Sequence, residues 1–143
     1  MATIDLPNNI LEALSTVLQQ LQQSLPEVKQ APDFSAIAFK WENGELKAIH
    51  QLKRIELNDL KGIERQKEKV LENTEQFLKV LPANDVLLTG SRGTGKSSIV
   101  RALLTEYAEQ GLRLIEIERD DLSELPEIQK LIAERPEKFI VYC

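Results

Sequence analysis

One short run of the sequence combines three glycines with an adjacent lysine and serine. In order, its residues are Gly90, Ser91, Arg92, Gly93, Thr94, Gly95, Lys96 and Ser97. The run follows the apolar residues 86–88 and precedes residues 99–108, which have apolar positions at helical spacing. This pattern between a strand and a helix is typical of loops that bind phosphate groups. The sequence therefore predicts a nucleotide-binding site at this turn.

Each residue type in the run has a physical role. Glycines adopt positive φ angles, so backbone N–H groups from Gly93 to Ser98 can surround the α- and β-phosphates, with the positive end of a helix dipole behind them. Lys96 would reach the β- and γ-phosphates and is the candidate catalytic residue. The Ser97 hydroxyl would bind Mg²⁺. Ser91 and Arg92 lie in the variable part of the loop, where we expect the Arg92 side chain to be solvated.

Composition narrows the class of protein. The chain has 143 residues, a net charge of −5 and one cysteine, at position 143. The acidic balance gives no clear signal for nucleic-acid binding. No apolar stretch is long enough to cross a membrane, and the N-terminus lacks the pattern of a signal peptide. We therefore expect a cytoplasmic protein without disulfides. His50, the single histidine, has no Cys or His neighbours that would complete a metal site.

Hydrophobic periodicity predicts an α/β fold in which a parallel sheet is flanked by helices. Residues 1–50 are expected to form an N-terminal region of one helix and a β-hairpin, and residues 51–143 the nucleotide-binding core. A linker is expected at residues 26–34. The expected helices are residues 7–25, 64–78, 96–110 and 122–134, and the expected strands are 36–41, 46–49, 85–89, 112–117 and 138–143.

The first helix has apolar residues at helical spacing and a polar face rich in glutamine. Packing into a core is the simpler interpretation of this pattern. Docking onto a partner is the alternative.

Nucleotide hydrolysis by this class of loop needs an acidic residue at the end of a hydrophobic strand. The apolar residues 139–142 resemble that strand, and the acid would be expected after Cys143. Glu116, Glu118, Asp120 and Asp121 are rival candidates, although their alternation with apolar residues is more typical of a half-exposed strand end. We therefore expect the chain to be the N-terminal part of a longer ATPase.

Residues 57–67, 73–78, 81–98 and 110–116 together resemble the bacterial AAA+ ATPases of domain-of-unknown-function family 815. The resemblance runs from about Phe39 to the end of the sequence. It implies a partial AAA+ P-loop module that binds ATP and Mg²⁺, with Gly62 and Ile63 helping to hold adenine. It also implies that a full-length parent hydrolyses ATP and can form homo-oligomers. In the family topology a sensor strand separates the strands at residues 85–89 and 138–143. Without it, we expect those two strands to pair directly or the fold to be marginally stable.

Two other functional classes stay open. A P-loop kinase or GTPase fragment would share the loop, although no guanine-reading Asn-Lys-x-Asp element is present. A non-catalytic interaction module would use residues 1–50 to bind a partner and nucleotide only to organise the fold.

Overall fold

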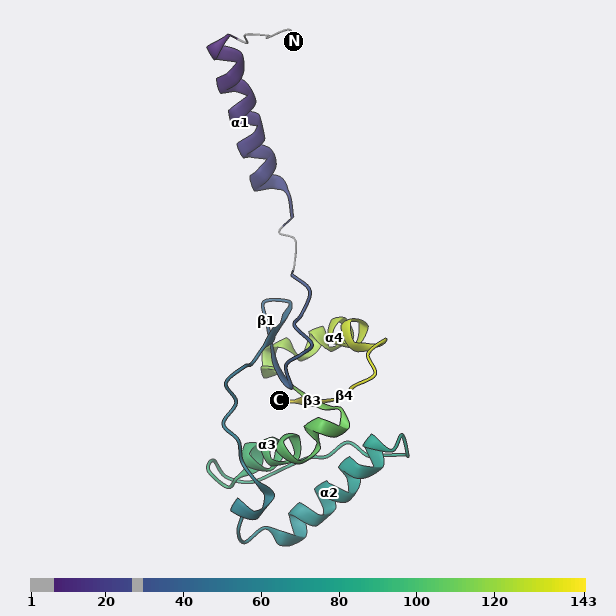
Figure 1. Ribbon diagram of the computed structural model, residues 1–143. Coiled ribbons are helices and arrows are strands. Elements are labelled where there is room, and N and C mark those ends of the chain that lie inside the picture. The colour runs from purple at the N-terminus through teal and green to yellow at the C-terminus, as the bar shows by residue number, and fades with distance from the viewer. Residues whose placement is uncertain (1–6, 27–29) are drawn as a thin grey trace. The chain divides into compact units, whose positions relative to one another are not determined.

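The computed structural model describes residues 7–26 and 30–143, and the chain divides into two compact units (Figure 1). The first unit spans Met1–Ala31 and the second Pro32–Cys143. The β-hairpin expected in the N-terminal region belongs to the second unit. The boundary between compact units therefore does not coincide with the domain boundary expected at residue 50.

The first unit contains helix α1 (Asn8–Ser24), as the periodicity predicted. None of the residues Asn8–Ser24 is buried. The first unit therefore offers this helix no core of its own, and the simpler interpretation, packing into a core, is not confirmed. The linker expected at 26–34 lies partly outside the described residues, because residues 27–29 are not described.

The second unit is built on a four-stranded sheet with the order β2-β1-β3-β4. Strands β1 (Ala38–Glu42) and β2 (Glu45–Ala48) form the predicted antiparallel hairpin. Its turn residues Asn43 and Gly44 both have positive φ, which suits a two-residue hairpin turn. Strands β3 (Leu112–Glu116) and β4 (Lys138–Tyr142) are parallel, and β3 also pairs parallel with β1. The sheet is therefore mixed, because the hairpin is part of it.

Helices cover both faces of this sheet (Figure 1). On one face, α2 (Glu64–Leu78) and α3 (Lys96–Tyr107) pack against the sheet. On the other face, the 3₁₀ turn Arg119–Glu124 leads into α4 (Leu125–Ile132), which has Pro126 in its first turn. Alternate residues along β3 divide between the faces, with Leu114 on the α3 side and Ile115 on the α4 side. This alternation is what a sheet buried on both faces requires.

The helix that follows the glycine-rich run is the most deeply packed helix of the unit. Its buried side chains are Ile99, Val100, Ala102, Leu103, Leu104 and Tyr107. A short 3₁₀ turn, Ala108–Gln110, continues the helix to Gly111, which has φ 94°. Glycine ends the helix there because the left-handed conformation strains other residues. Both ends of the predicted helix 96–110 are thus confirmed.

The strand predicted at residues 85–89 does not form, so the first of the two expected alternatives, direct pairing with the last strand, is wrong. The second alternative, marginal stability of the fold, stays a prediction. A strand requires a neighbour whose backbone groups complete its hydrogen bonds. A cavity instead lies between residues 83–88 and β4. Val86 and Leu87 therefore stay 48% and 87% exposed in an extended segment without ladder partners.

Among the described residues, no helix combines the length and the apolar character that crossing a membrane would need.

Helices α2 and α3 are joined by a buried tyrosine, and this contact makes stability depend on pH. The Tyr107 hydroxyl donates a hydrogen bond to Glu75 Oε1 at 2.9 Å. Burial, and then the bond to Glu75, raises the pKa of Tyr107 to about 12. In the unfolded chain a tyrosine has a pKa of about 10. Stability from this group is therefore complete below about pH 10 and is lost as pH rises through about 12.

We predict that the free energy of unfolding of the wild type falls by about 2–3 kcal/mol more than that of Tyr107→Phe between about pH 10 and 12. Denaturant titrations at a series of alkaline pH values measure this difference. Parallel pH profiles for the two proteins would contradict it. Absorbance titration gives a second check, because the variant should lack a tyrosine that ionises near pH 12.

Candidate functional site

The glycine loop, residues 90–97, connects the extended segment to α3 (Figure 1). Gly90, Gly93 and Gly95 all have positive φ, at 151°, 81° and 85°. Gly95 is the residue immediately before α3 and has a left-handed conformation. The loop therefore uses glycine where other residues would be strained. This backbone path directs the chain around the amino end of the helix.

Lys96, the first residue of α3, folds its side chain back into the loop. Its Nζ donates to Gly90 O at 2.6 Å and to Ser91 O at 2.7 Å, and lies 3.3 Å from Thr94 Oγ1. The Thr94 hydroxyl donates to Ser91 O at 2.8 Å. The ammonium group is thus held at the centre of the loop by backbone oxygens. Its positive charge and the amino end of α3 lie together, a combination that attracts anions.

The approach of the chain at Gly90 leaves no room for a side chain. A Cβ placed there would lie 2.8 Å from Thr94 Oγ1 and 3.8 Å from Lys96 Nζ. By contrast, a Cβ at Gly93 or Gly95 would meet nothing within 4 Å. Gly90 is therefore required both for its φ and for the space it leaves around Lys96.

The backbone N–H groups of the loop are available to a ligand. Within the described part of the chain, the N–H groups of residues 93–98 have no acceptor, and the first amide bonded into the helix is Ile99, which donates to Gly95 O at 2.9 Å. Free amides at the start of a helix form a concave anion site. The unpaired amides and the Lys96 ammonium group are hydrogen-bond donors, and they suit the phosphate groups that the sequence predicts.

The remaining predicted loop residues lie at the surface. Ser91, Arg92 and Ser97 are exposed, and Ser98 is half-buried. Exposure of Arg92 agrees with the expectation that its side chain is solvated. The Ser97 hydroxyl lies in the first turn of α3, where a serine next to bound phosphates is a suitable Mg²⁺ ligand.

The rival acidic residues are engaged elsewhere. Glu116, at the carboxyl end of β3, pairs with Arg101 on α3 at 3.7 Å. Glu118 pairs with Lys40 on β1 at 3.7 Å. Asp120 and Asp121 belong to the 3₁₀ turn before α4. Across residues 7–26 and 30–143, no cluster of three or more His, Cys, Asp or Glu side chains could hold a metal ion. These pairings agree with the interpretation of residues 116–121 as a half-exposed strand end.

Gly62 and Ile63, the predicted adenine contacts, immediately precede α2. Ile63 packs against the core cluster that contains Ile99 and Val100 from α3. Gly62 is exposed, has φ 75°, and a Cβ there would meet nothing within 4 Å. The fold thus brings Ile63 to the helix that follows the glycine loop. The role of Gly62 and Ile63 in holding adenine stays a prediction.

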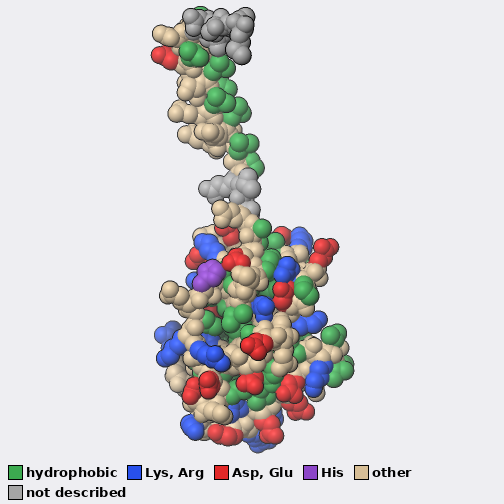
Figure 2. All heavy atoms as spheres, in the orientation of Figure 1, with side chains coloured by type: hydrophobic (Ala, Val, Ile, Leu, Met, Phe, Trp, Pro, Cys, Tyr) green, Lys and Arg blue, Asp and Glu red, His purple; other side chains and the backbone are tan. Residues whose placement is uncertain are grey.

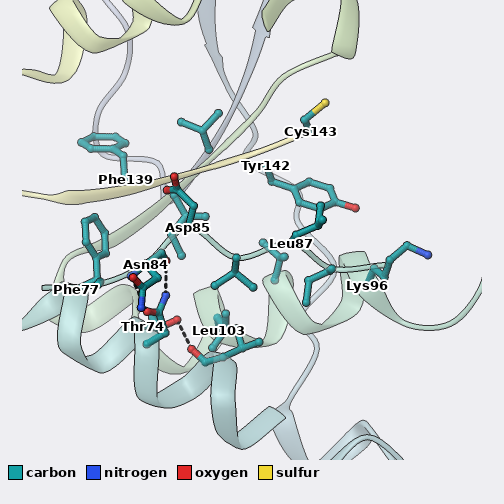
Figure 3. Close-up of a pocket in the computed structure, with 18 residues that line it drawn as sticks. Thr74, Phe77, Asn84, Asp85, Leu87, Lys96, Leu103, Phe139, Tyr142 and Cys143 are labelled. Atoms are coloured by element: carbon teal, nitrogen blue, oxygen red, sulfur yellow. Dashed lines mark hydrogen bonds between the residues drawn. The ribbon is translucent and has the colours of Figure 1, made fainter. Parts of the chain in front are cut away.

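A cavity of about 640 Å³ lies beside the loop and was not foreseen from the sequence. Its lining combines residues of α2, α3 and β4 with residues 83–88, and it includes Lys96 (Figure 3). The labelled lining residues are Thr74, Phe77, Asn84, Asp85, Leu87, Lys96, Leu103, Phe139, Tyr142 and Cys143. Most of them come from elements far apart in sequence, so no local pattern signals the cavity.

One side chain that sequence reasoning missed positions the segment before the loop. Asn73 Oδ1 on α2 accepts from the Asn84 backbone N–H at 2.9 Å, and its Nδ2 donates to the Asn84 carbonyl at 2.7 Å (Figure 3). This amide pairs with the backbone as a neighbouring strand would. In the sequence, Asn73 is only a polar residue beside the apolar face of a predicted helix, so its role could not be predicted.

Comparison with known proteins agrees with the extent of the second compact unit. The model of a family described as a protein of unknown function, DUF815, matches residues 34–143. No curated protein and no solved structure matched the chain. Because the matched residues make up well over half of the chain, this protein belongs to the DUF815 family.

Proposed function

We propose that this chain binds ATP through the glycine loop, with Mg²⁺ bound by the hydroxyl of Ser97. One observation supports the proposal. At the start of α3, the glycine loop brings together the unpaired amides of residues 93–98 and the ammonium group of Lys96. Amides and a lysine that converge at a helix start suit the phosphate chain of a nucleotide.

In this proposal Lys96 exchanges its bonds to Gly90 O and Ser91 O for phosphate oxygens. The exchange replaces neutral carbonyl acceptors by charged ones, which form stronger hydrogen bonds with an ammonium group. Loop amides bind the α- and β-phosphates, and Ser97 gives Mg²⁺ one protein ligand. Ile63 and Gly62 would then lie on the adenine side of the site.

We also propose that the family fold is an AAA+ P-loop module, as the sequence resemblance implies. Hydrolysis is proposed for a parent protein in which an acidic residue completes the magnesium shell. The best-placed acids of this chain, Glu116 and Glu118, are already paired with Arg101 and Lys40. ATP binding is therefore the activity that we assign to this chain.

The first prediction from this proposal concerns Lys96. ATP with Mg²⁺ at 100 times its Kd should raise the free energy of unfolding by about 2.7 kcal/mol. Lys96→Ala should weaken ATP binding by about 1.5–3 kcal/mol, because a charged hydrogen-bond donor to the phosphates is lost. Calorimetric titration measures both affinities, and thermal unfolding with ATP or GTP tests the base. Lys69→Ala, which removes an exposed lysine from α2, is the matched control and should bind as the wild type does.

Three results would contradict all or part of the proposal. Folded wild-type protein that takes up no ATP would exclude binding at the loop. Equal affinity in the wild type and Lys96→Ala would place the nucleotide elsewhere. Stronger stabilisation by GTP than by ATP would keep the phosphate site but exclude adenine as the preferred base.

The second prediction concerns Mg²⁺. In the wild type, chelating Mg²⁺ should weaken ATP binding, whereas in Ser97→Ala the affinity should be low and nearly independent of Mg²⁺. Titrations of both proteins with and without chelator make the comparison. If chelation weakens ATP binding equally in the two proteins, Ser97 does not bind the metal.

The third prediction concerns the space around Gly90. Gly90→Ala should destabilise the protein by about 1–3 kcal/mol, because the new methyl group strains φ and collides with Thr94 Oγ1. In a Thr94→Ala background the same change should cost less, since the collision is removed and only the backbone strain is left. A double-mutant cycle of unfolding free energies measures the difference. Gly62→Ala, at positive φ in open space, is the control for strain alone. Additive effects of Gly90→Ala and Thr94→Ala would contradict the collision.

A further inference from the structure

Helix α1 carries an apolar face whose side chains are exposed. The apolar side chains of this face are 42–66% exposed, and they are Ile10, Leu11, Leu14, Val17, Leu18, Leu21 and Leu25. Figure 2 shows them gathered along one side of the helix. A face of this size on a helix in water normally marks a contact with another molecule.

The spacing of these residues defines two overlapping seams. The first seam, Ile10, Leu14, Val17 and Leu21, has alternating steps of four and three residues. The second seam, Leu11, Leu14, Leu18, Leu21 and Leu25, has alternating steps of three and four. Steps of three and four are the heptad spacing at which helices pack side by side.

Two seams on one helix form a wider apolar stripe than a simple pair buries. A two-helix coiled coil needs only one narrow stripe, whereas helices inside a bundle carry a wider one. Because the seams share Leu14 and Leu21, they lie side by side on the helix. Each helix can therefore contact two neighbours at once, and a closed ring of such contacts needs at least three helices.

The charge of the helix indicates what those neighbours are. Asn8–Ser24 contains one charged residue, Glu12, which lies outside both seams, and no lysine or arginine. Helices that lie on anionic membranes are rich in Lys and Arg. Helices that select a different partner usually do so with charges beside the seam. A nearly uncharged helix is not repelled by the charges of an identical copy, so it can pack against copies of itself.

We propose that α1 associates with α1 of other copies of this chain in a helical bundle of at least three chains. The bundle buries both seams and leaves the face rich in glutamine in water. This assembly does not depend on nucleotide binding, because its residues belong to the separate first unit of the chain.

Sedimentation of the full chain over a range of concentrations tests the proposal. The wild type should reach at least three times the mass of one chain, with or without ATP. Leu14→Glu/Leu21→Glu removes the residues common to both seams and should give a monomer. Gln19→Glu/Gln23→Glu adds the same charge outside both seams and should assemble as the wild type does.

Variants that remove one seam test the geometry. Ile10→Gln/Val17→Gln leaves only the second seam, and Leu11→Gln/Leu18→Gln leaves the first seam whole, so each should reduce the assembly to a dimer. Thermal unfolding of the second compact unit and ATP binding serve as controls. Both should be unchanged in every variant, which would show that the fold of this unit is intact.

Three outcomes would overturn the proposal. A wild type that stays monomeric at all concentrations would exclude self-association. Assembly that survives Leu14→Glu/Leu21→Glu would place the contact elsewhere on the chain. A monomer that co-sediments with vesicles of phosphatidylcholine and phosphatidylglycerol, and loses this property with Leu14→Glu/Leu21→Glu, would make the face a membrane contact.

Discussion

The packing of α3 against the sheet is the constraint on which the glycine loop depends. Side chains of α3 such as Leu103 and Leu104 are almost fully buried, against Leu112 and Leu114 of β3. Burial of each such side chain contributes about 1.5–3 kcal/mol. This packing fixes the amino end of the helix, so the free amides and Lys96 have a fixed place although the loop itself is exposed. A packed helix with an exposed loop at its amino end suits a site that must admit a ligand.

Local sequence signals were sufficient where an element is specified by its own residues. The hairpin is specified by Asn43-Gly44 between two apolar runs, and the end of α3 is specified by Gly111. Helix α2 was predicted with the bounds that the structure gives it. The loop glycines were expected at positive φ and have it. In each case the turn or cap residue admits few other conformations, so the sequence leaves little choice.

Predictions that depended on distant partners were less successful. Residues 85–89 have the composition of a strand, but β-structure also needs a neighbouring strand, which no local pattern supplies. The role of Asn73 was invisible for the same reason, since its partner Asn84 is eleven residues away on a different element. The cavity beside β4 combines four such separate segments. For α1 the amphipathic pattern was correct, but the pattern alone does not say whether the apolar face meets the same chain or another one.

The bonds that Lys96 makes within the loop bear on how strongly the proposed site can select its ligand. Gly90 O and Ser91 O stabilise the ammonium group at 2.6 and 2.7 Å, so a ligand must offer stronger acceptors than two carbonyls. A neutral ligand would gain little from displacing them, whereas phosphate oxygens carry full charge and also engage the free amides of residues 93–98. Because the amides have no acceptor in the protein, a polyanion exchanges only their bonds to water and breaks no protein hydrogen bond at those groups. A ligand must therefore displace the carbonyl bonds of Lys96, and its bonds to the amides provide the favourable free energy. Together these two requirements favour polyphosphates over single weak anions.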